Sequence, residues 1–534
     1  MKGKIESEIS LIMDIKQASL WASEYLKRQI NPSNISYLVQ YGRIRKYTLN
    51  GRVFIDIRDL KDYYDKNFDK INAEKYGDIN WHLSFANYTE KERTKHVHRL
   101  HPYKGKFIPQ LVEYFLDNHT DEFKKEVYFN QGDIVLDPFC GSGTTLVQAN
   151  ELGLHAIGID ISYFNTLIAN VKIKKHNLIL IESIAKDLTR KLINFQDKLG
   201  NIEFEKRLTE ELTNFNNRYF PSPDYKRKVA EKLINEEEYG KHKEQEFAKI
   251  YENIKAQYGI KIETNKRSNR FMDIWFSDPV KYELEFLAEE IKSIEDEEVR
   301  EVLILILSRT ARSCRATTHA DLATLKEPVY APYYCKKHKK ICKPIFSISK
   351  WWKFYVEDTI SRLSEFSKVR TDTMQICLVG DARTIDLQEE LSRRMPNLAE
   401  LVMKKKIKGI FTSPPYVGLI DYHEQHAYAY ELFGFERRDD LEIGALSKGR
   451  SAKQREAYVI DISKALLNLK KYLVDDYDVF IVANDKYGLY PKIAELAGMK
   501  IVNEFKRPVL CRVEKNRETP YYESIFHLKE GGTD

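Results

Sequence analysis

The first strong pattern of apolar residues lies about a quarter of the way along the chain. An apolar run at 134–136 is followed by a glycine-rich turn at 140–145, and apolar residues at helical spacing continue over 146–152. A second apolar run, 156–159, ends on Asp160. The pattern predicts a strand, a turn, a helix and a second strand, in which the glycines let backbone approach a ligand. Asp160 is then placed to accept hydrogen bonds from a ribose.

The glycine-rich turn is not a P-loop, because no Gly-Lys-Ser/Thr sequence follows its glycines. A second turn, rich in proline, indicates which kind of substrate the chain binds. Residues 409–416 form a short apolar strand that runs into Ser413-Pro414-Pro415-Tyr416. Two prolines fix φ and remove backbone donors, so we expect the Ser413 hydroxyl and nearby carbonyls to point outward from a rigid turn. The tyrosine offers a flat face on which a planar base can stack.

Further apolar runs predict more strands. They lie at 374–383, 478–485 and 499–505, and the tail at 507–529 is expected to close as an antiparallel hairpin. Because helical patterns separate the strands, the expected fold is α/β, with a mostly parallel, Rossmann-like sheet and helices on both faces. In such sheets a ligand binds at the carboxyl ends of the strands, where the strand order reverses.

The first 66 residues have a pattern of their own. Apolar residues at helical spacing over 11–30 predict a helix, 31–33 break it, and a second helix is expected over 34–41. Two short strands around Asn50 and Gly51 give a strong hairpin signal. The arrangement resembles the small winged helix-turn-helix domains of excisionases; a protein-docking domain is the alternative. The residues expected on DNA are Ser33, Asn34, Ser36, Tyr37 and Gln40 in a major groove, and Arg43, Arg45, Lys46 and Arg52 on phosphates.

Composition and charge set limits on location and partners. A chain of 534 residues, 43% of them hydrophobic, fits two or three domains with a large core. The net charge is only +6, so any basic DNA-binding surface must be local. The sequence has no run of membrane-spanning length, no signal-peptide core at its start, and six scattered cysteines. We therefore expect a cytoplasmic protein without disulfides or membrane contact.

The glycine-rich turn and the proline turn together resemble a known family. DPFCGSGTT (137–145) is similar to the cofactor loop, and TSPPY (412–416) to the catalytic loop, of S-adenosylmethionine-dependent methyltransferases that modify exocyclic amino groups in DNA. Serine at the first position of the catalytic tetrapeptide is typical of the cytosine-N4 enzymes, whereas adenine-N6 enzymes mostly carry Asp or Asn. The resemblance covers about residues 96–177 and 373–530, and it implies a class I methyltransferase fold.

The resemblance also implies a cofactor, partners and residue roles. The cofactor is S-adenosyl-L-methionine, the substrate is the cytosine N4 amino group in double-stranded DNA, and a cognate restriction endonuclease is a further partner. Asp160 is expected on the ribose, Asp381 on the adenine and Asp137 on the methionine ammonium group, with Thr144 or Thr145 on its carboxylate. The expected catalytic residues are Ser413, Pro414, Pro415 and Tyr416. Just past this loop, Glu424, His423 and His426 could contact DNA or position the loop, but surface histidines are the expectation. The expected cofactor-binding residues are Lys106, Phe107, Asp137, Phe139, Cys140, Gly141, Gly143, Thr144, Thr145, Asp160, Ile161, Asp381 and Ala382.

These interpretations divide the chain into five parts. They are a winged helix-turn-helix domain (1–68), a linker (69–95), the first half of the methyltransferase domain (96–177), an inserted helical region (178–372) and the second half (373–534). The insertion is first charged and helical, and then rich in Lys, Tyr and Trp. We expect Arg309, Arg312 and Arg315 to emerge from the end of a buried helix there. The insertion is therefore the expected target-recognition region; a helical clamp without base contact is the alternative.

One segment of the insertion carries metal-binding side chains. Cys335, His338 and Cys342 would need Cys314 or His319 as a fourth zinc ligand. The segment lacks the paired Cys-x-x-Cys spacing of most structural zinc sites. A lysine-rich loop with incidental thiols is the expectation, and no metal is assigned.

Three other functions remain open from the sequence. The enzyme could methylate adenine N6, since Ser413 in place of Asp is a tendency of one group rather than a law. It could methylate guanine N2 in RNA, because those enzymes have similar loops. It could be a transcriptional regulator with a degenerate methyltransferase body, although the intact loops with Asp160 and Asp381 argue against this alternative.

Overall fold

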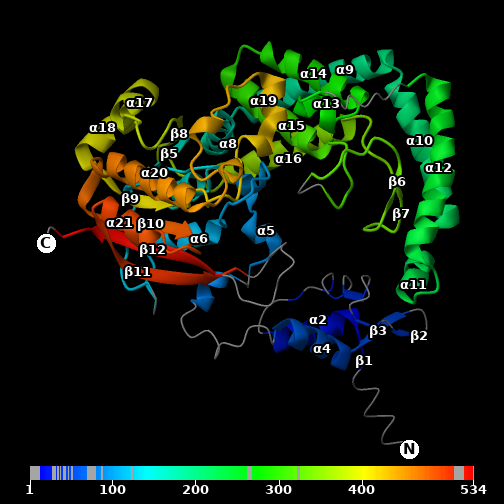
Figure 1. Ribbon diagram of the computed structural model, residues 1–534, viewed down its shortest axis with the longest axis horizontal. Helices are drawn as coiled ribbons and strands as arrows, with labels where there is room; N and C mark the ends of the chain where they lie inside the picture. Colours follow the sequence, from blue (N-terminus) through cyan, green and yellow to red (C-terminus); the bar gives the residue numbers. More distant parts are fainter. Residues whose placement is uncertain are drawn as a thin grey trace, which may run out of the picture. The chain divides into compact units, whose positions relative to one another are not determined.

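The computed structural model describes the chain with several gaps (Figure 1). The described residues are 12–26, 30, 32, 35, 38, 39, 44, 45, 47–49, 52–68, 80–85, 88–121, 124–260, 268–321, 325–509 and 522–532. Two compact units are formed, one from 1–90 with 505–523 and the other from 91–504 with 524–534. Within the described residues, no helix is both long and apolar enough to cross a membrane.

A seven-stranded sheet forms the centre of the larger unit. Its strand order is β11-β12-β10-β9-β4-β5-β8. Neighbours from β10 to β8 are parallel, and β12 is antiparallel to β10. The predicted α/β fold with a mostly parallel sheet is therefore confirmed. The strands are β4 (Ile134–Asp137), β5 (His155–Asp160), β8 (Gln375–Val379), β9 (Ile407–Thr412), β10 (Leu473–Ala483), β11 (Met499–Pro508) and β12 (Tyr522–Glu530).

The strand order reverses between β4 and β9. From β4 the chain proceeds to β5 and β8 on one side, whereas β9 is followed by β10 on the other. β4 and β9 pair in parallel, with Val135 opposite Gly409 and Leu136 opposite Ile410. The loops that follow these two strands therefore start side by side, at the edge where doubly wound sheets bind their ligands.

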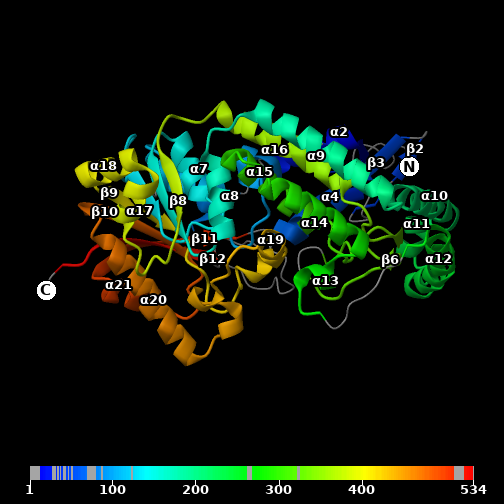
Figure 2. The same cartoon turned by 90° about the horizontal axis from the view of Figure 1, so that it is seen from above.

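Helices cover both faces of the sheet (Figures 1 and 2). One face carries α6 (Pro109–Leu116), α7 (Thr144–Glu151) and α8 (Tyr163–Ile173). The other carries α17 (Leu387–Arg394), α18 (Pro396–Lys405), α20 (Ala452–Lys470) and α21 (Tyr490–Leu496). Shorter elements of the larger unit are η3 (His96–Arg99), η4 (Glu424–His426), α19 (Ala427–Phe433), η5 (Asp439–Leu441) and η6 (Leu446–Lys448); α5 (Glu90–Arg93) begins at the unit boundary.

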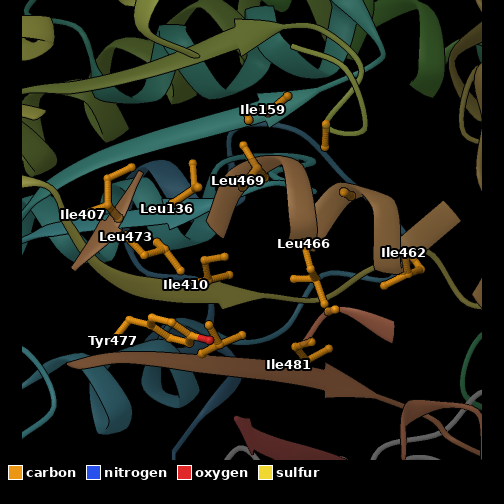
Figure 3. Close-up of a cluster of buried hydrophobic side chains, with 14 of the residues drawn as sticks. Leu136, Ile159, Ile407, Ile410, Ile462, Leu466, Leu469, Leu473, Tyr477 and Ile481 are labelled. Carbon is orange, nitrogen blue, oxygen red and sulfur yellow. The ribbon is translucent and has the colours of Figure 1, made fainter. Parts of the chain in front are cut away.

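Successive side chains on the central strands point to opposite faces of the sheet. Ile410 of β9 and Ile481 of β10 belong to a buried apolar cluster with one side of α20 (Figure 3). Their neighbours Phe411 and Phe480 face the other way, where their ring centroids lie 5.8 and 4.9 Å from that of Phe115 in α6. This alternation buries both faces of the strands that end at the ligand edge.

Between α8 and β8 the chain is mainly helical. α10 and α12 lie side by side next to the short hairpin β6–β7, and their shared buried cluster includes Phe204, Phe247 and Ile341 (Figures 1 and 2). The elements are α9 (Leu178–Lys198), α10 (Asn201–Tyr219), α11 (Asp224–Ala230), α12 (Glu236–Tyr258), α13 (Phe271–Trp275), α14 (Asp278–Lys292), α15 (Glu297–Ser313), β6 (Tyr333–Cys335), β7 (Lys340–Cys342) and α16 (Ser349–Ser367).

The smaller unit contains a three-stranded sheet in the order β1-β3-β2. The hairpin expected around Asn50 and Gly51 forms, because Leu49 of β2 pairs with Arg52 of β3. The helix expected from residue 11 is wrong at its start: Asp14 caps the helix with its side chain, and the residues before it pair with β3. The elements are β1 (Ile12–Asp14), α2 (Ile15–Tyr25), β2 (Tyr47–Leu49), β3 (Arg52–Asp56), α4 (Ile57–Phe68) and η2 (Trp81–Ser84).

Most of the predicted DNA-contacting residues of this unit cannot be placed. Of the second expected helix, residues 35, 38 and 39 are described, and these three are helical. Arg45 is exposed and lies 3.5 Å from Asp59. Outside the described residues are Ser33, Asn34, Ser36, Tyr37, Gln40, Arg43 and Lys46, and the Arg52 side chain is not described. The winged helix-turn-helix interpretation therefore stays a prediction.

Candidate active site

A cleft lies at the carboxyl ends of β4, β5, β8 and β9, where the strand order reverses. It encloses about 810 Å³ of space, part of which is open to solvent. Most of the predicted site residues line it, although they come from segments more than 300 residues apart. These are Lys106, Phe107, Phe139, Cys140, Gly141, Thr144, Asp160, Ile161, Asp381, Ala382, Ser413 and Pro415. The predicted residues that do not line it are Asp137, Gly143, Thr145, Pro414 and Tyr416.

The loop after β4 needs glycine at two positions. Gly141 and Gly143 both have left-handed backbone, with φ of 51° and 77°. A Cβ atom on Gly141 would lie 2.9 Å from the Tyr103 hydroxyl, and one on Gly143 would lie 2.8 Å from Cβ of Ala169. The loop backbone is therefore tightly enclosed, and its exposed edge faces the cleft. Cys140 is buried in this loop, and burial raises the pKa of its thiol, as expected for a packing residue.

Asp160 ends β5 and ties the glycine loop to the next helix. Its carboxylate accepts hydrogen bonds from the backbone N–H groups of Gly141 at 2.8 Å and Ser162 at 2.9 Å. The side-chain amide of Asn165 donates a third, at 3.1 Å. Burial raises the pKa of Asp160 above its usual value. These contacts fix the carboxylate in the wall of the cleft.

Asp137 lies directly behind the cleft, and its side chain is buried. Its carboxylate accepts hydrogen bonds from the hydroxyls of Thr145, at 2.7 Å, and Thr412, at 2.6 Å. Burial raises the pKa of Asp137 to about 6, and the two hydroxyls work in the opposite direction. Asp137 thus joins the cofactor loop to the end of β9. The role expected for it on a methionine ammonium group stays a prediction.

The turn Ser413–Tyr416 separates two cavities. Ser413 and Pro415 line the cleft described above, and Pro414 is buried between them. Tyr416 instead lines a second cavity at the carboxyl ends of β9 and β10, which encloses about 560 Å³. Other residues around the second cavity are Val417, Leu419, Arg450, Asn484, Tyr487 and Tyr490. The Ser413–Tyr416 turn therefore presents its serine and its tyrosine to different spaces.

The segment before α6 closes the cleft from the side. Lys106 donates a hydrogen bond of 2.6 Å to the carbonyl of His98, and the Phe107 ring packs edge-on against Phe411, with centroids 5.5 Å apart. The Tyr103 ring stacks at 6.1 Å on that of Tyr422. Lys106 and Phe107 lie where they were expected, and Tyr103 is an additional lining residue.

Asp381 follows β8 on the far side of the cleft. Its carboxylate accepts a hydrogen bond of 2.9 Å from the backbone N–H of Arg383. It also forms an ion pair of 2.6 Å with the guanidinium of the same arginine. Arg383 also pairs with Asp461 of α20 at 3.0 Å. The arginine therefore fixes Asp381 in place by bridging it to α20.

Several lining residues were not identified from the sequence. They are Asn165, Tyr422, Leu441, Glu442 and Ile443. Glu442 accepts hydrogen bonds from the backbone N–H groups of Tyr422 and His423, and it pairs with the His423 ring. The other four lie between Tyr416 and α20, in a stretch that has no motif and little periodicity. Asn165 alone had a local signal, because it lies in the first turn of α8, shortly after Asp160 at the end of β5.

Other expectations about nearby charged side chains were wrong. His423 and His426, expected at the surface, are buried, and burial lowers the pKa of His426 to about 3. Arg309 does not emerge from α15: it is buried, pairs with Asp358, and stacks on the Tyr355 ring at 4.3 Å. Arg315 is also buried. Arg309 therefore joins α15 to α16, and these four buried side chains do not form an exposed basic patch.

The cleft fits S-adenosylmethionine in its donor groups and backbone. It combines a loop in which two glycines have no room for a side chain with two fixed carboxylates. These are Asp160 at the end of β5 and Asp381 after β8. Between them, Phe107, Phe139 and Ile161 provide apolar wall. This set suits a ligand that carries an amino acid, a ribose and a flat base.

Comparisons with known proteins agree with this chemistry. Residues 25–171 match the DNA methylase family N6_N4_Mtase. The chain is 49% identical over 528 residues to the type II methyltransferase M.MjaII of Methanocaldococcus jannaschii, covering 96% of both chains. It is 35% identical over 113 residues to the type II methyltransferase M.MvaI of Kocuria varians, covering 21% of this chain and 23% of the relative.

A shorter part of the chain is similar to an enzyme that acts on tRNA. The chain is 41% identical over 49 residues to a tRNA (guanine(10)-N2)-dimethyltransferase of Methanocaldococcus jannaschii, covering 9% of this chain and 14% of that protein. The similarity to M.MjaII extends over almost the whole of both chains and therefore decides the family. The chain belongs to the N6/N4 family of type II DNA methyltransferases, which use S-adenosylmethionine as the methyl donor.

Proposed function

We propose that the protein methylates the exocyclic N4 amino group of cytosine in duplex DNA, as the modification enzyme of a restriction–modification pair. One observation carries the proposal. Ser413, the first residue of Ser-Pro-Pro-Tyr, lines the same cleft as the cofactor loop. Thr412, one residue earlier, is hydrogen-bonded to Asp137, the first residue of that loop. The acceptor group and the methyl donor are thereby brought together by buried contacts.

The chain's own residues would hold the cofactor along the cleft. Asp160 is assigned to the ribose hydroxyls and Asp381 to the adenine amino group, with Gly141 and Thr144 around the methionine part. When bound, S-adenosylmethionine supplies a methyl group that its sulfonium already activates. The protein therefore needs to contribute geometry rather than a nucleophile, and Cys140, which is buried in the loop, has no covalent role.

The Ser413–Tyr416 turn would make the cytosine amino group a better nucleophile. The lone pair of the cytosine amino group is delocalised into the ring, which makes it a poor nucleophile. Hydrogen bonds from this amino group to the Ser413 hydroxyl and the Pro414 carbonyl would direct the lone pair toward the methyl group. Positioning two bound reactants in line can lower a barrier by about 7–11 kcal/mol in favourable cases.

The target base must leave the duplex before it can reach this turn. Extruding a base costs a few kcal/mol, and stacking against an aromatic ring offsets about 1–3 kcal/mol of that cost. We assign the cavity lined by Tyr416, between the ends of β9 and β10, to the ring of the extruded base, whose amino group would extend past Pro415 into the neighbouring cleft, where Ser413 lies. Tyr416 → Ala should therefore weaken capture of the extruded cytosine more than it weakens cofactor binding.

DNA binding outside the cleft is assigned to two further parts. The 1–68 segment, with its β2–β3 hairpin, is proposed as a winged helix-turn-helix that contacts DNA. The 178–372 region is proposed as the target-recognition region, where the exposed Lys336 and Lys337 lie in the β6–β7 turn and the exposed Lys340 begins β7. The type II relatives suggest that a cognate restriction endonuclease recognises the same site.

Two alternatives belong to the same chemistry. Adenine N6 carries a similar exocyclic amino group, and only the serine of the tetrapeptide favours cytosine. Guanine N2 in RNA is favoured by the tRNA relatives, but those matches cover only 9–12% of this chain. The near full-length similarity to M.MjaII supports DNA as the substrate.

The test is methyl transfer from labelled S-adenosylmethionine under single-turnover conditions, with duplex DNA and tRNA as separate substrates. We expect label in duplex DNA, and a Ser413→Ala variant that transfers methyl much more slowly while it binds DNA almost normally. Ser392→Ala is the matched control, because this serine is exposed on α17. Transfer at the wild-type rate by Ser413→Ala, or label in tRNA alone, would contradict the proposal.

A further inference from the structure

Four side chains that can bind a metal converge at the β6–β7 hairpin, away from both cavities. They are His319, Cys335, His338 and Cys342, and one ligand atom from each lies within 4.8 Å of all the others. We propose that this cluster is a structural zinc site. The structure selects His319 as the fourth ligand; Cys314, the other candidate in the sequence, is buried at the end of α15 and is not part of the cluster.

The spacing of the ligand atoms is close to that of a tetrahedral zinc site. Nδ1 of His319 lies 3.9 Å from Sγ of Cys335, and Nδ1 of His338 lies 3.4 Å from Sγ of Cys342. Zinc binds Cys sulfur at about 2.3 Å and His nitrogen at about 2.0–2.1 Å, which places neighbouring tetrahedral ligands roughly 3.3–3.8 Å apart. Small side-chain adjustments are therefore enough to admit the ion.

The hairpin places three of the four ligands. Cys335 ends β6, Cys342 ends β7, and His338 lies in the turn between them. The turn is fixed by backbone hydrogen bonds from His338 and Lys339 to the Cys335 carbonyl, at 3.1 and 2.7 Å. Lys339 adopts left-handed backbone, with φ of 56°. This turn brings the histidine back toward the two thiols.

A tyrosine positions the fourth ligand. The Tyr333 hydroxyl accepts a hydrogen bond of 2.9 Å from the backbone N–H of His319, and it lies 2.8 Å from Nδ1 of the same residue. The imidazole of His319 thereby packs against that of His338, with ring centroids 4.4 Å apart. The backbone contact with Tyr333 holds His319 at the hairpin, and the contact at Nδ1 would be exchanged for the ion.

The chemistry of the ligand set indicates a structural rather than a catalytic ion. Two cysteines and two histidines fill all four tetrahedral positions and leave none for a substrate. Cys335 and Cys342 are 3% and 6% exposed, so the ion would be shielded from solvent. The cluster contains no carboxylate, and its ligand type favours zinc over magnesium or calcium.

A metal here would stabilise a hairpin that is otherwise small. Each strand has three residues, and two-stranded hairpins are marginally stable at best. The hairpin is anchored on α10, where the Asn216 side chain exchanges two hydrogen bonds with the Ile341 backbone, at 2.9 and 3.0 Å. The zinc would fix its other end, which carries the exposed lysine turn.

The direct test is the zinc content of the reduced, full-length protein, measured by elemental analysis after purification without chelators. We expect one zinc per chain in the wild type. Cys335→Ser and Cys342→Ser should lose it, whereas Cys314→Ala should keep it because that thiol is outside the cluster. Zinc in both serine variants at the wild-type level would overturn the proposal.

A second measurement covers variants that fail to fold. The wild-type protein stripped of metal and given Co²⁺ should develop the thiolate-to-cobalt absorption of a tetrahedral sulfur–nitrogen site, and Zn²⁺ should abolish it. Failure of the wild type to take up either ion when fully reduced would overturn the proposal. A disulfide between Cys335 and Cys342 would also overturn it. Intact mass would show this disulfide as a loss of two hydrogens that persists after Zn²⁺ is added under mild reduction.

Discussion

The Thr412 hydroxyl donates a hydrogen bond of 2.6 Å to the carboxylate of Asp137, a residue 275 positions away in the sequence. Thr412 ends β9 and Asp137 ends β4, and both side chains are buried. The Ser413–Tyr416 turn begins directly after Thr412, and Asp137 is the first residue of the glycine-rich loop 137–145. This one contact therefore links the turn proposed to act on the target base to the loop proposed to hold the cofactor.

The first prediction concerns this hydrogen bond. Thr412→Val keeps the shape of the side chain but leaves the Asp137 carboxylate with one donor fewer. A buried hydrogen bond to a charged group contributes about 1.5–3 kcal/mol, so we expect a loss of that size in the free energy of unfolding and a slower methyl transfer. Thr412→Ser, which keeps the hydroxyl, is the control. Equal stability of the valine and serine variants in denaturant titrations would show that the contact is unimportant.

The second prediction concerns pH. Burial raises the pKa of Asp137 in the folded protein to about 6, from an ordinary value of 3.8. The folded state therefore holds this proton more tightly than the unfolded state, and Asp137 stabilises the fold less as pH rises from about 4 to about 6. The expected loss is roughly 3 kcal/mol at 1.36 kcal/mol per pH unit.

Thermal unfolding at several pH values checks this sign. The Asp137→Asn variant lacks the titrating group, so its stability relative to the wild type should rise between pH 4 and pH 7 and change little above that range. A stability difference that is constant over the whole range would mean that Asp137 does not titrate there.

The third prediction concerns cofactor binding. Asp160→Ala removes the carboxylate assigned to the ribose and leaves the Gly141 N–H without its acceptor. We expect clearly weaker binding of S-adenosylmethionine in isothermal titration, with the fold retained. Asp372→Ala is the control, because Asp372 is 96% exposed and forms an ion pair with a surface lysine, Lys175. Unchanged affinity in Asp160→Ala would remove this residue from the site.

The fourth prediction concerns the first 69 residues. A chain that begins at residue 70 still contains Asn80. It therefore keeps the two hydrogen bonds, at 2.8 and 2.9 Å, between Asn80 and Lys506 near the end of β11. It should still bind S-adenosylmethionine but bind DNA more weakly, and with a smaller dependence on salt. If its DNA affinity and salt dependence both equal those of the full chain, the segment is a docking module.

The sheet and its two loops could be predicted because their signals are local. Buried parallel strands appear as short apolar runs, and the loops after β4 and β9 are marked by glycines and prolines with defined backbone requirements. Gly141 illustrates this, since its left-handed backbone and close contact with Tyr103 exclude any side chain. The position of the cleft then follows from the strand order alone.

The missed residues depend on contacts that the sequence does not encode locally. Glu442 and Tyr422 line the cleft, but they lie in irregular chain and meet through hydrogen bonds across a loop. Arg309 was expected to be exposed because it lies near the end of an apolar helix. It is instead paired with Asp358 of α16, a helix that is distant in sequence. His319 could not be chosen over Cys314 because only the fold brings it to the hairpin.

The central claim is the identity of the methylated atom, and one measurement addresses it directly. Duplex DNA is methylated with S-adenosylmethionine carrying a labelled methyl group, digested to nucleosides and analysed by mass spectrometry. The account predicts that the label is found in N4-methylcytosine. Label in N6-methyladenine would contradict the assignment that rests on Ser413, and the absence of label from duplex DNA would contradict the proposed function as a whole.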